Sequence, residues 1–166
     1  MIQKQNPVNA VGNKTPMHAA LNILSRRQVS TGQMRFMLSR KGYALDDIQS
    51  CIEKLEGWGY LNDMVLARNI LGAMIRNAPC GKKRCFYELR KRRFDRDLAE
   101  TLIQEAYSEF DERDLAHAAA KQYAKNKTKW TLKDRERLAR WLFRRGFTEA
   151  TILSVAKTFG RVGDYE

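Results

Sequence analysis

Basic side chains are the residues of this sequence whose type and spacing most favour binding chemistry. The chain of 166 residues carries 31 Lys and Arg against 19 Asp and Glu, which gives a formal net charge of +12. Seven basic residues fall within positions 82–93, where Glu88 is the single acid. Such a surface attracts polyanions, among them nucleic acid, an anionic membrane and an acidic protein face. Charge alone does not choose among these partners.

The basic residues of positions 82–93 lie on or beside one predicted helix that has two different faces. Steps of three and four residues turn Cys85, Phe86 and Leu89 inward, so basic residues follow an outward stripe. A charged stripe is usually only a solvated face, but arginine can pair with phosphate or carboxylate through two hydrogen bonds. We predict that the partner-binding or DNA-binding residues are Arg40, Lys41, Lys82, Lys83, Arg84, Arg90, Lys91, Arg92, Arg93, Arg140, Arg144 and Arg145.

Residues that commonly perform catalysis or bind metals are poorly placed. Four residues separate Cys80 from Cys85, which is not the CxxC spacing of a zinc site, and no histidine cluster completes one. His18 and His117 are each the single histidine of a predicted helix, and the GxxxxGK[ST] loop that binds ATP is absent. We expect no catalytic residue, no metal and no cofactor, so the protein is predicted not to be an enzyme.

The elements that position the basic residues are predicted to be helices. Three prolines and ten glycines are few for this length, and Ala, Leu, Arg, Lys and Glu dominate long segments. No apolar run approaches the roughly 20 residues that span a bilayer. Residues 1–15 lack the apolar core of a signal peptide, and three cysteines do not suggest a disulfide framework. We expect a cytoplasmic, monomeric protein.

Capping residues mark the starts of several helices. Thr15 precedes a proline suited to the first helical position, and Ser30 with Gln33 has the spacing of a capping box. Asp63 can cap another helix, and Thr131 is followed three residues later by an aspartate. These signals divide the chain into short helices rather than a few long ones.

One helical unit recurs three times in the chain. Five positions match without a gap at an offset of 51 residues, and again at a further offset of 53 residues. A period in this range is typical of stacked helical units. The matching positions are Leu38, Tyr43, Ile48, Ile52 and Leu55 in the first copy, Leu89, Phe94, Ala99, Ile103 and Ala106 in the second, and Leu142, Phe147, Ile152, Ala156 and Phe159 in the third.

The position before the aromatic residue of each copy breaks this regularity. Gly42 and Gly146 occupy it in the first and third copies, whereas Arg93 occupies it in the second. Either Arg93 adopts a left-handed conformation, at roughly 1 kcal/mol relative to glycine, or the turn of the second copy differs.

These observations predict an all-α fold of three tandem three-helix units that form an elongated, curved array. We expect a flexible N-terminal tail over residues 1–14 and helical repeats over residues 15–62, 63–110 and 111–166. Each repeat has too small a core to be stable alone, so stacking between neighbouring repeats is expected to matter.

Three short segments carry a resemblance to a known family. Residues 59–63 read Gly-Tyr-Leu-Asn-Asp and close the first unit, and residues 81–84 read Gly-Lys-Lys-Arg. Residues 142–147 read Leu-Phe-Arg-Arg-Gly-Phe in the third unit. Together with the three tandem units, these segments make residues 16–160 similar to the RecX family.

The resemblance implies a regulator of the RecA recombinase that is not an enzyme. Members of this family lie along the groove of the RecA–DNA filament, where they inhibit strand exchange and ATP hydrolysis. The implied partners are the RecA filament and single-stranded or duplex DNA, bound alone or only together with RecA. The sequence departs from the family pattern at Leu66, Lys82, Cys85 and Arg93, where phenylalanine, proline, isoleucine and glycine are usual.

A helix-turn-helix DNA-binding transcription regulator is the alternative function. Residues 131–159 contain two predicted helices joined at Gly146, which is compatible with that motif. However, the same pair occurs three times, and the helix from Thr148 to Phe159 carries Lys157 as its single base. A recognition helix usually presents several polar side chains to the DNA bases.

Overall fold

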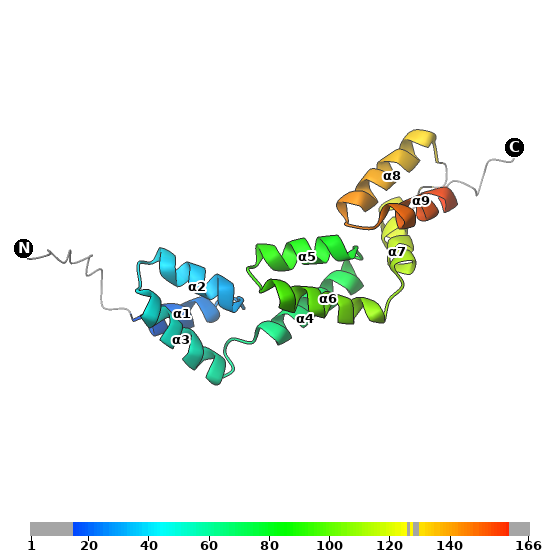
Figure 1. Ribbon diagram of the computed structural model, residues 1–166. Helices are drawn as coiled ribbons and strands as arrows, with labels where there is room; N and C mark the ends of the chain where they lie inside the picture. Colours follow the sequence, from blue (N-terminus) through cyan, green and yellow to red (C-terminus); the bar gives the residue numbers. More distant parts are fainter. Residues whose placement is uncertain (1–14, 126, 128–129, 160–166) are drawn as a thin grey trace, which may run out of the picture. The chain divides into compact units, whose positions relative to one another are not determined.

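The computed structural model describes residues 15–125, 127 and 130–159 (Figure 1). These residues contain nine α-helices and no strand, which confirms the predicted all-α fold. The predicted tail, residues 1–14, lies outside the described residues. The helices are α1 (Pro16–Leu24), α2 (Thr31–Arg40), α3 (Leu45–Gly57), α4 (Asp63–Asn77), α5 (Lys82–Lys91), α6 (Arg96–Ser108), α7 (Glu112–Ala124), α8 (Leu132–Arg144) and α9 (Glu149–Thr158).

The helices pack in groups of three, within two compact units of the chain. Unit 1 is Met1–Leu61 and contains α1, α2 and α3, which contact one another. Unit 2 is Asn62–Glu166, where α4 packs with α5 and α6, and α7 packs with α8 and α9. The predicted repetition of helical units is therefore confirmed. The repeat boundaries and the elongated, curved array stay predictions. None of the described helices is long and apolar enough to cross a membrane.

Each unit has its own apolar core, built from one side of every helix. In unit 1, Met34, Leu38 and Leu55 are completely buried. In unit 2 a single cluster runs through all six helices, from Leu71 of α4 to Val155 of α9. Because both groups of three helices share this cluster, unit 2 is stabilised as one body rather than as two separate repeats.

The turn between the second and third helices of each group is the same in all three copies. Gly42, Arg93 and Gly146 have φ angles of 86°, 57° and 81°. Arg93 thus adopts the left-handed conformation that glycine adopts in the other copies. This conformation costs a residue with a side chain about 1 to 2 kcal/mol.

The structure corrects one predicted helix start. Asn62, not Asp63, caps α4, because its side-chain oxygen accepts a hydrogen bond of 3.0 Å from the backbone N–H of Val65. Asp63 instead occupies the first helical position, where its carboxylate interacts favourably with the positive end of the helix dipole. The capping box predicted at the start of α2 is confirmed, and the helix start predicted at Thr131 is also a capping box.

Candidate anion-binding groove

Four arginines line one hollow of about 530 Å³ in unit 2. They come from the two helices that occupy the middle position of their groups, α5 and α8, and from the residues that cap their C-terminal ends. We call this hollow the arginine groove. Its lining residues are Met74, Ala78, Cys80, Arg84, Glu88, Arg92, Trp141, Arg144 and Arg145.

The spacing of charged residues along α5 explains how this helix contributes to the groove. Arg84, Glu88 and Arg92 are four residues apart, so they follow one face of the helix. Arg84 forms an ion pair of 2.6 Å with Glu88, whose side chain is only 17% exposed. The groove therefore has four guanidinium groups and one carboxylate among its lining residues, and the carboxylate is already paired.

Two glycines bring α5 against the end of α8. The N–H of Gly81 donates a hydrogen bond of 2.8 Å to the carbonyl oxygen of Arg145. A Cβ atom on Gly81 would lie 2.0 Å from the carbonyl oxygen of Gly146, and one on Gly146 would lie 2.4 Å from the backbone nitrogen of Arg84. Only glycine permits this approach of the two backbones, which places Arg84 beside the turn that carries Arg145.

Arg145 fixes the wall of the groove. Its guanidinium donates hydrogen bonds of 3.0 Å and 3.3 Å to the carbonyl oxygens of Ala78 and Pro79, and it lies 4.5 Å from the ring centroid of Trp141. Trp141 packs against the apolar core, and it also lines the groove. Arg145 thus braces the site, whereas Arg144 is exposed and has no ion pair among the described residues.

The other predicted site residues lie outside the arginine groove. Arg90 forms a hydrogen bond within its own turn, in which its guanidinium donates to the carbonyl oxygen of Phe94. Lys82 donates a hydrogen bond of 3.0 Å to Gln104, and Lys83 is exposed beside it. The remaining residues, all exposed, are Arg40 and Lys41 in unit 1, Lys91 and Arg93 near the end of α5, and Arg140 on α8.

Five residues of the groove were not among the predicted site residues; besides Met74 and Ala78, they are Cys80, Glu88 and Trp141. The last three have polar, charged or reactive groups. The sequence did hold a signal for two of them. Glu88 stands four residues after Arg84, and Trp141 stands four residues before Arg145, which are the spacings of helical neighbours. Cys80 precedes α5 and had no such signal.

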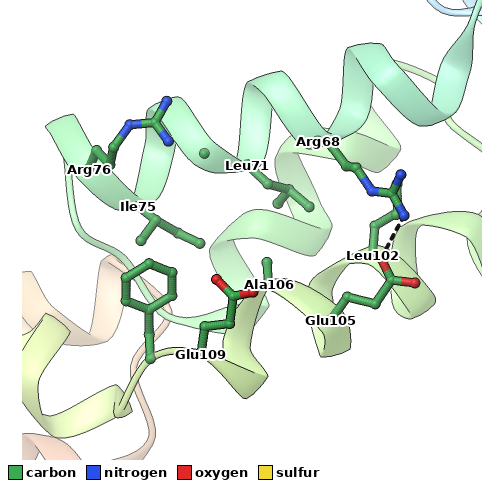
Figure 2. A pocket seen from close by; sticks show the side chains of 10 residues that line it. Arg68, Leu71, Ile75, Arg76, Leu102, Glu105, Ala106 and Glu109 are labelled. Atoms are coloured by element: carbon green, nitrogen blue, oxygen red, sulfur yellow. Dashed lines mark hydrogen bonds and ion pairs between the residues drawn. The ribbon is translucent and has the colours of Figure 1, made fainter.

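A second hollow of unit 2, between α4 and α6, has a different charge (Figure 2). It measures about 270 Å³, and its lining includes Arg68 and Arg76 but also Glu105 and Glu109. Arg68 is bonded to Glu105 at 3.0 Å. Because its two arginines are matched by two glutamates, this hollow has no excess of positive charge to attract an anion.

Metal ligands and cysteines are the other reactive side chains to consider in the described part of the chain. No group of three or more His, Cys, Asp or Glu side chains there could bind a metal ion. The cysteines Cys51, Cys80 and Cys85 are buried and free. The arrangement is suited to binding phosphate or carboxylate groups through arginine.

Comparisons with known proteins agree with this architecture. Residues 17–55 match the family model described as RecX, first three-helix domain. A crystal structure of RecX from Lactobacillus salivarius superposes with a TM-score of 0.69 at 20% identity, covering 86% of this chain and 93% of that one. This likeness supports the fold.

Curated relatives extend the match along most of the sequence. Regulatory protein RecX of Syntrophotalea carbinolica is 27% identical over 136 residues, which cover 81% of this chain and 89% of the relative. Regulatory protein RecX of Pelodictyon phaeoclathratiforme is 32% identical over 142 residues, which cover 85% of this chain and 86% of the relative. With the three helical groups already described, these matches lead to one conclusion: the chain belongs to the RecX family of regulatory proteins.

Proposed function

We propose that this protein regulates RecA by binding the RecA–DNA filament and inhibiting its recombinase and ATPase activities. Membership of the RecX family supports the class of function. The observation that carries the proposal is the arginine groove, in which guanidinium groups from α5 and α8 converge within one compact unit. Filament-bound DNA phosphates and acidic protein side chains are the anionic groups that such a site would bind.

The proposed action is binding without catalysis. A basic surface opposes the filament's active cycle by occupying a site that RecA subunits or DNA need, and it does so as a cytoplasmic monomer. Arg84, Arg92 and Arg144 make the anion contacts in this proposal, and Arg145 positions them. The exposed bases outside the groove, including Arg40, Lys41, Lys83 and Lys91, add long-range attraction.

The experiment that tests the proposal is a titration of the DNA-dependent ATPase of RecA. Substoichiometric amounts of the protein should inhibit ATP hydrolysis by RecA from the same organism. A variant with Arg84, Arg92 and Arg144 all changed to Gln should inhibit much less. The matched control changes Arg26, Arg76 and Arg113, which are exposed and lie outside the groove, to Gln. An absence of inhibition by the unaltered protein at every ratio would rule out the proposal.

Binding to bare DNA separates this function from the helix-turn-helix alternative. In α9, the exposed residues include Glu149, Leu153 and Lys157, so a single cation is available to a recognition helix. Affinities for random duplex, candidate operator duplex and RecA-coated single strand should be compared across salt concentrations. Preference for RecA-coated DNA is expected, whereas strong preference for one bare duplex sequence would favour a transcription regulator.

A further inference from the structure

Two buried cysteines lie next to each other at the wall of the arginine groove. The sulfur atoms of Cys80 and Cys85 are 3.6 Å apart. Cys80 is 2% exposed, and Cys85 is 0% exposed. We propose that Cys80 and Cys85 form a reversible redox site, oxidised by peroxide to a disulfide that loosens the arginine groove. The part of the proposal that concerns RecA rests on the proposed function above.

A small oxidant can reach this pair through the groove. Cys80 is among the residues that line the hollow, together with Arg84 and Arg145. Hydrogen peroxide is about the size of a water molecule. The hydrogen bond with Cys85 and burial raise the pKa of Cys80, and the charges of Arg145 and Arg84 act against that rise. Cys51, in contrast, lies alone in the core of unit 1.

The oxidation balances without any further reactant. The sulfur of Cys80 attacks one oxygen of hydrogen peroxide, the O–O bond breaks, and the thiol proton leaves in a water molecule. This step takes two electrons from Cys80 and leaves a sulfenic acid. The sulfur of Cys85 then attacks that of Cys80, the S–S bond forms as the S–O bond breaks, and the hydroxyl leaves as water with the proton of Cys85.

The surroundings of Cys85 suit it to the second step. Its sulfur is 3.6 Å from that of Cys80 and 3.5 Å from the phenol oxygen of Tyr107. The hydrogen bonds from Cys80 and Tyr107 lower the pKa of Cys85, against the opposing effect of burial. Burial and the neighbouring Cys85 raise the pKa of Tyr107, so its phenol stays protonated as a donor. In the reduced pair, the single O–H of Tyr107 is directed at the carbonyl oxygen of Cys80.

Disulfide formation would disturb the backbone contact on which the groove depends. A disulfide needs the sulfur atoms about 2.05 Å apart, so two sulfur atoms that are now 3.6 Å apart must approach by about 1.5 Å. The segment from Cys80 to Cys85 contains Gly81 and Arg84, the residues that meet Gly146 with no space for a Cβ atom. Tight packing transmits the movement, and the bond from the Gly81 N–H to the Arg145 carbonyl is the contact expected to weaken.

Mass spectrometry of the full chain tests whether the disulfide forms. The protein is treated with hydrogen peroxide, alkylated and digested with trypsin, which cleaves at Lys82, Lys83 and Arg84 between the two cysteines. We expect a linked pair of peptides that dithiothreitol separates. The Cys51→Ser variant should give the same pair, and Cys85→Ser should give none. Absence of the linked peptides under conditions that oxidise a free thiol overturns the proposal.

Hydrogen exchange of the same samples tests the effect on the groove and needs no variant. Amides of residues 81–84 and 145–147 should exchange at least about tenfold faster in the oxidised protein, and dithiothreitol should restore the slow rates. Amides of α2 and α3 in unit 1 serve as the internal control. A disulfide that leaves these rates unchanged overturns the proposed coupling.

Inhibition of RecA then reports the functional consequence. The concentration of oxidised protein that half-inhibits the ATPase should rise by roughly tenfold, as when one charge-assisted contact is lost. If the reduced protein does not inhibit RecA, the proposed function fails while the peptide and exchange results still decide the redox site. Equal inhibition by both forms contradicts only the regulatory step.

Discussion

Gly146 combines two requirements that only glycine meets. Its φ of 81° lies in the left-handed region, and a Cβ atom would lie 2.4 Å from the backbone nitrogen of Arg84. Gly42 has a similar φ of 86° but open space around the position of a Cβ atom. A comparison of Gly42 with Gly146 therefore distinguishes the effect of backbone strain from the effect of close packing at equivalent turns.

We predict that Gly146→Ala destabilises the protein more than Gly42→Ala. The left-handed conformation should cost each variant about 1 to 2 kcal/mol. Gly146→Ala should lose about a further 1 to 3 kcal/mol, because the new methyl group meets backbone rather than a flexible side chain. Denaturant unfolding followed by circular dichroism measures both losses. Equal losses would contradict the close contact between Gly146 and α5.

Arg93 provides the opposite substitution at the second turn. It has a φ of 57°, where the sequences of the other two copies have glycine. Arg93→Gly should stabilise unit 2 by up to about 1 kcal/mol, since relief of strain exceeds the entropy that glycine adds to the unfolded chain. The same unfolding measurement checks this gain, with Arg92→Gly at the neighbouring position, where φ is -90°, expected to destabilise.

At the scale of single elements, the start of α8 depends on one carboxylate. Asp134 receives hydrogen bonds from the N–H and hydroxyl of Thr131, and it pairs with the ammonium of Lys127 at 2.7 Å. The bond with Lys127 and those with Thr131 lower the pKa of Asp134 below its ordinary value of 3.8. The charged form is therefore favoured by folding.

Asp134 should make stability depend on pH in the acid range. A carboxyl group with a lowered pKa in the folded state stabilises fully above its ordinary value of 3.8 and loses that contribution as the pH falls toward the lowered value. Asp134→Asn should lower the melting temperature near neutral pH and reduce its fall on acidification. Asp46→Asn, at an exposed position of α3, serves as the control. Parallel pH profiles for Asp134→Asn and the unaltered protein would contradict this role.

Elements were more predictable from the sequence than the site. The helix starts at Ser30 and Thr131 follow from side chains three residues apart, and the repeated positions Leu38 and Leu142 are both buried. Local spacing carries such information. The arginine groove instead depends on contact between Gly81 and Gly146, which are 65 residues apart. No local pattern specifies which basic residues that contact brings together.

The same limit explains how the structure changes the interpretation of the basic run at positions 82–93. On the sequence, its members are equivalent neighbours. In the fold, Arg90 is bound to the carbonyl oxygen of Phe94, while Arg84 and Arg92 line the groove with Arg144. The residues chosen for neutralisation are therefore those that two helices bring into one groove, not those that lie closest together along the sequence.

At the scale of the whole molecule, the net charge of +12 and the arginine groove should affect anion binding in different ways. Charges spread over the surface attract any polyanion, and salt at about 0.1 M screens that attraction at separations beyond about 10 Å. Guanidinium groups that contact phosphates release counterions, and each contact steepens the salt dependence of binding by a nearly fixed amount. The effect of the number of charges and the effect of their position can therefore be distinguished by experiment.

We predict that the variant with Gln at Arg84, Arg92 and Arg144 has a shallower salt dependence of binding to RecA-coated single-stranded DNA. If all three contact phosphates, the slope of log K against log salt should decrease by about 2 to 3, at roughly 0.7 to 0.9 per contact. The control variant with Gln at Arg26, Arg76 and Arg113 has the same net charge, so it should weaken binding modestly with a nearly unchanged slope. Fluorescence anisotropy across salt concentrations measures both. If the two variants lose slope equally, the groove has no special part in binding, and the whole basic surface acts as a diffuse field.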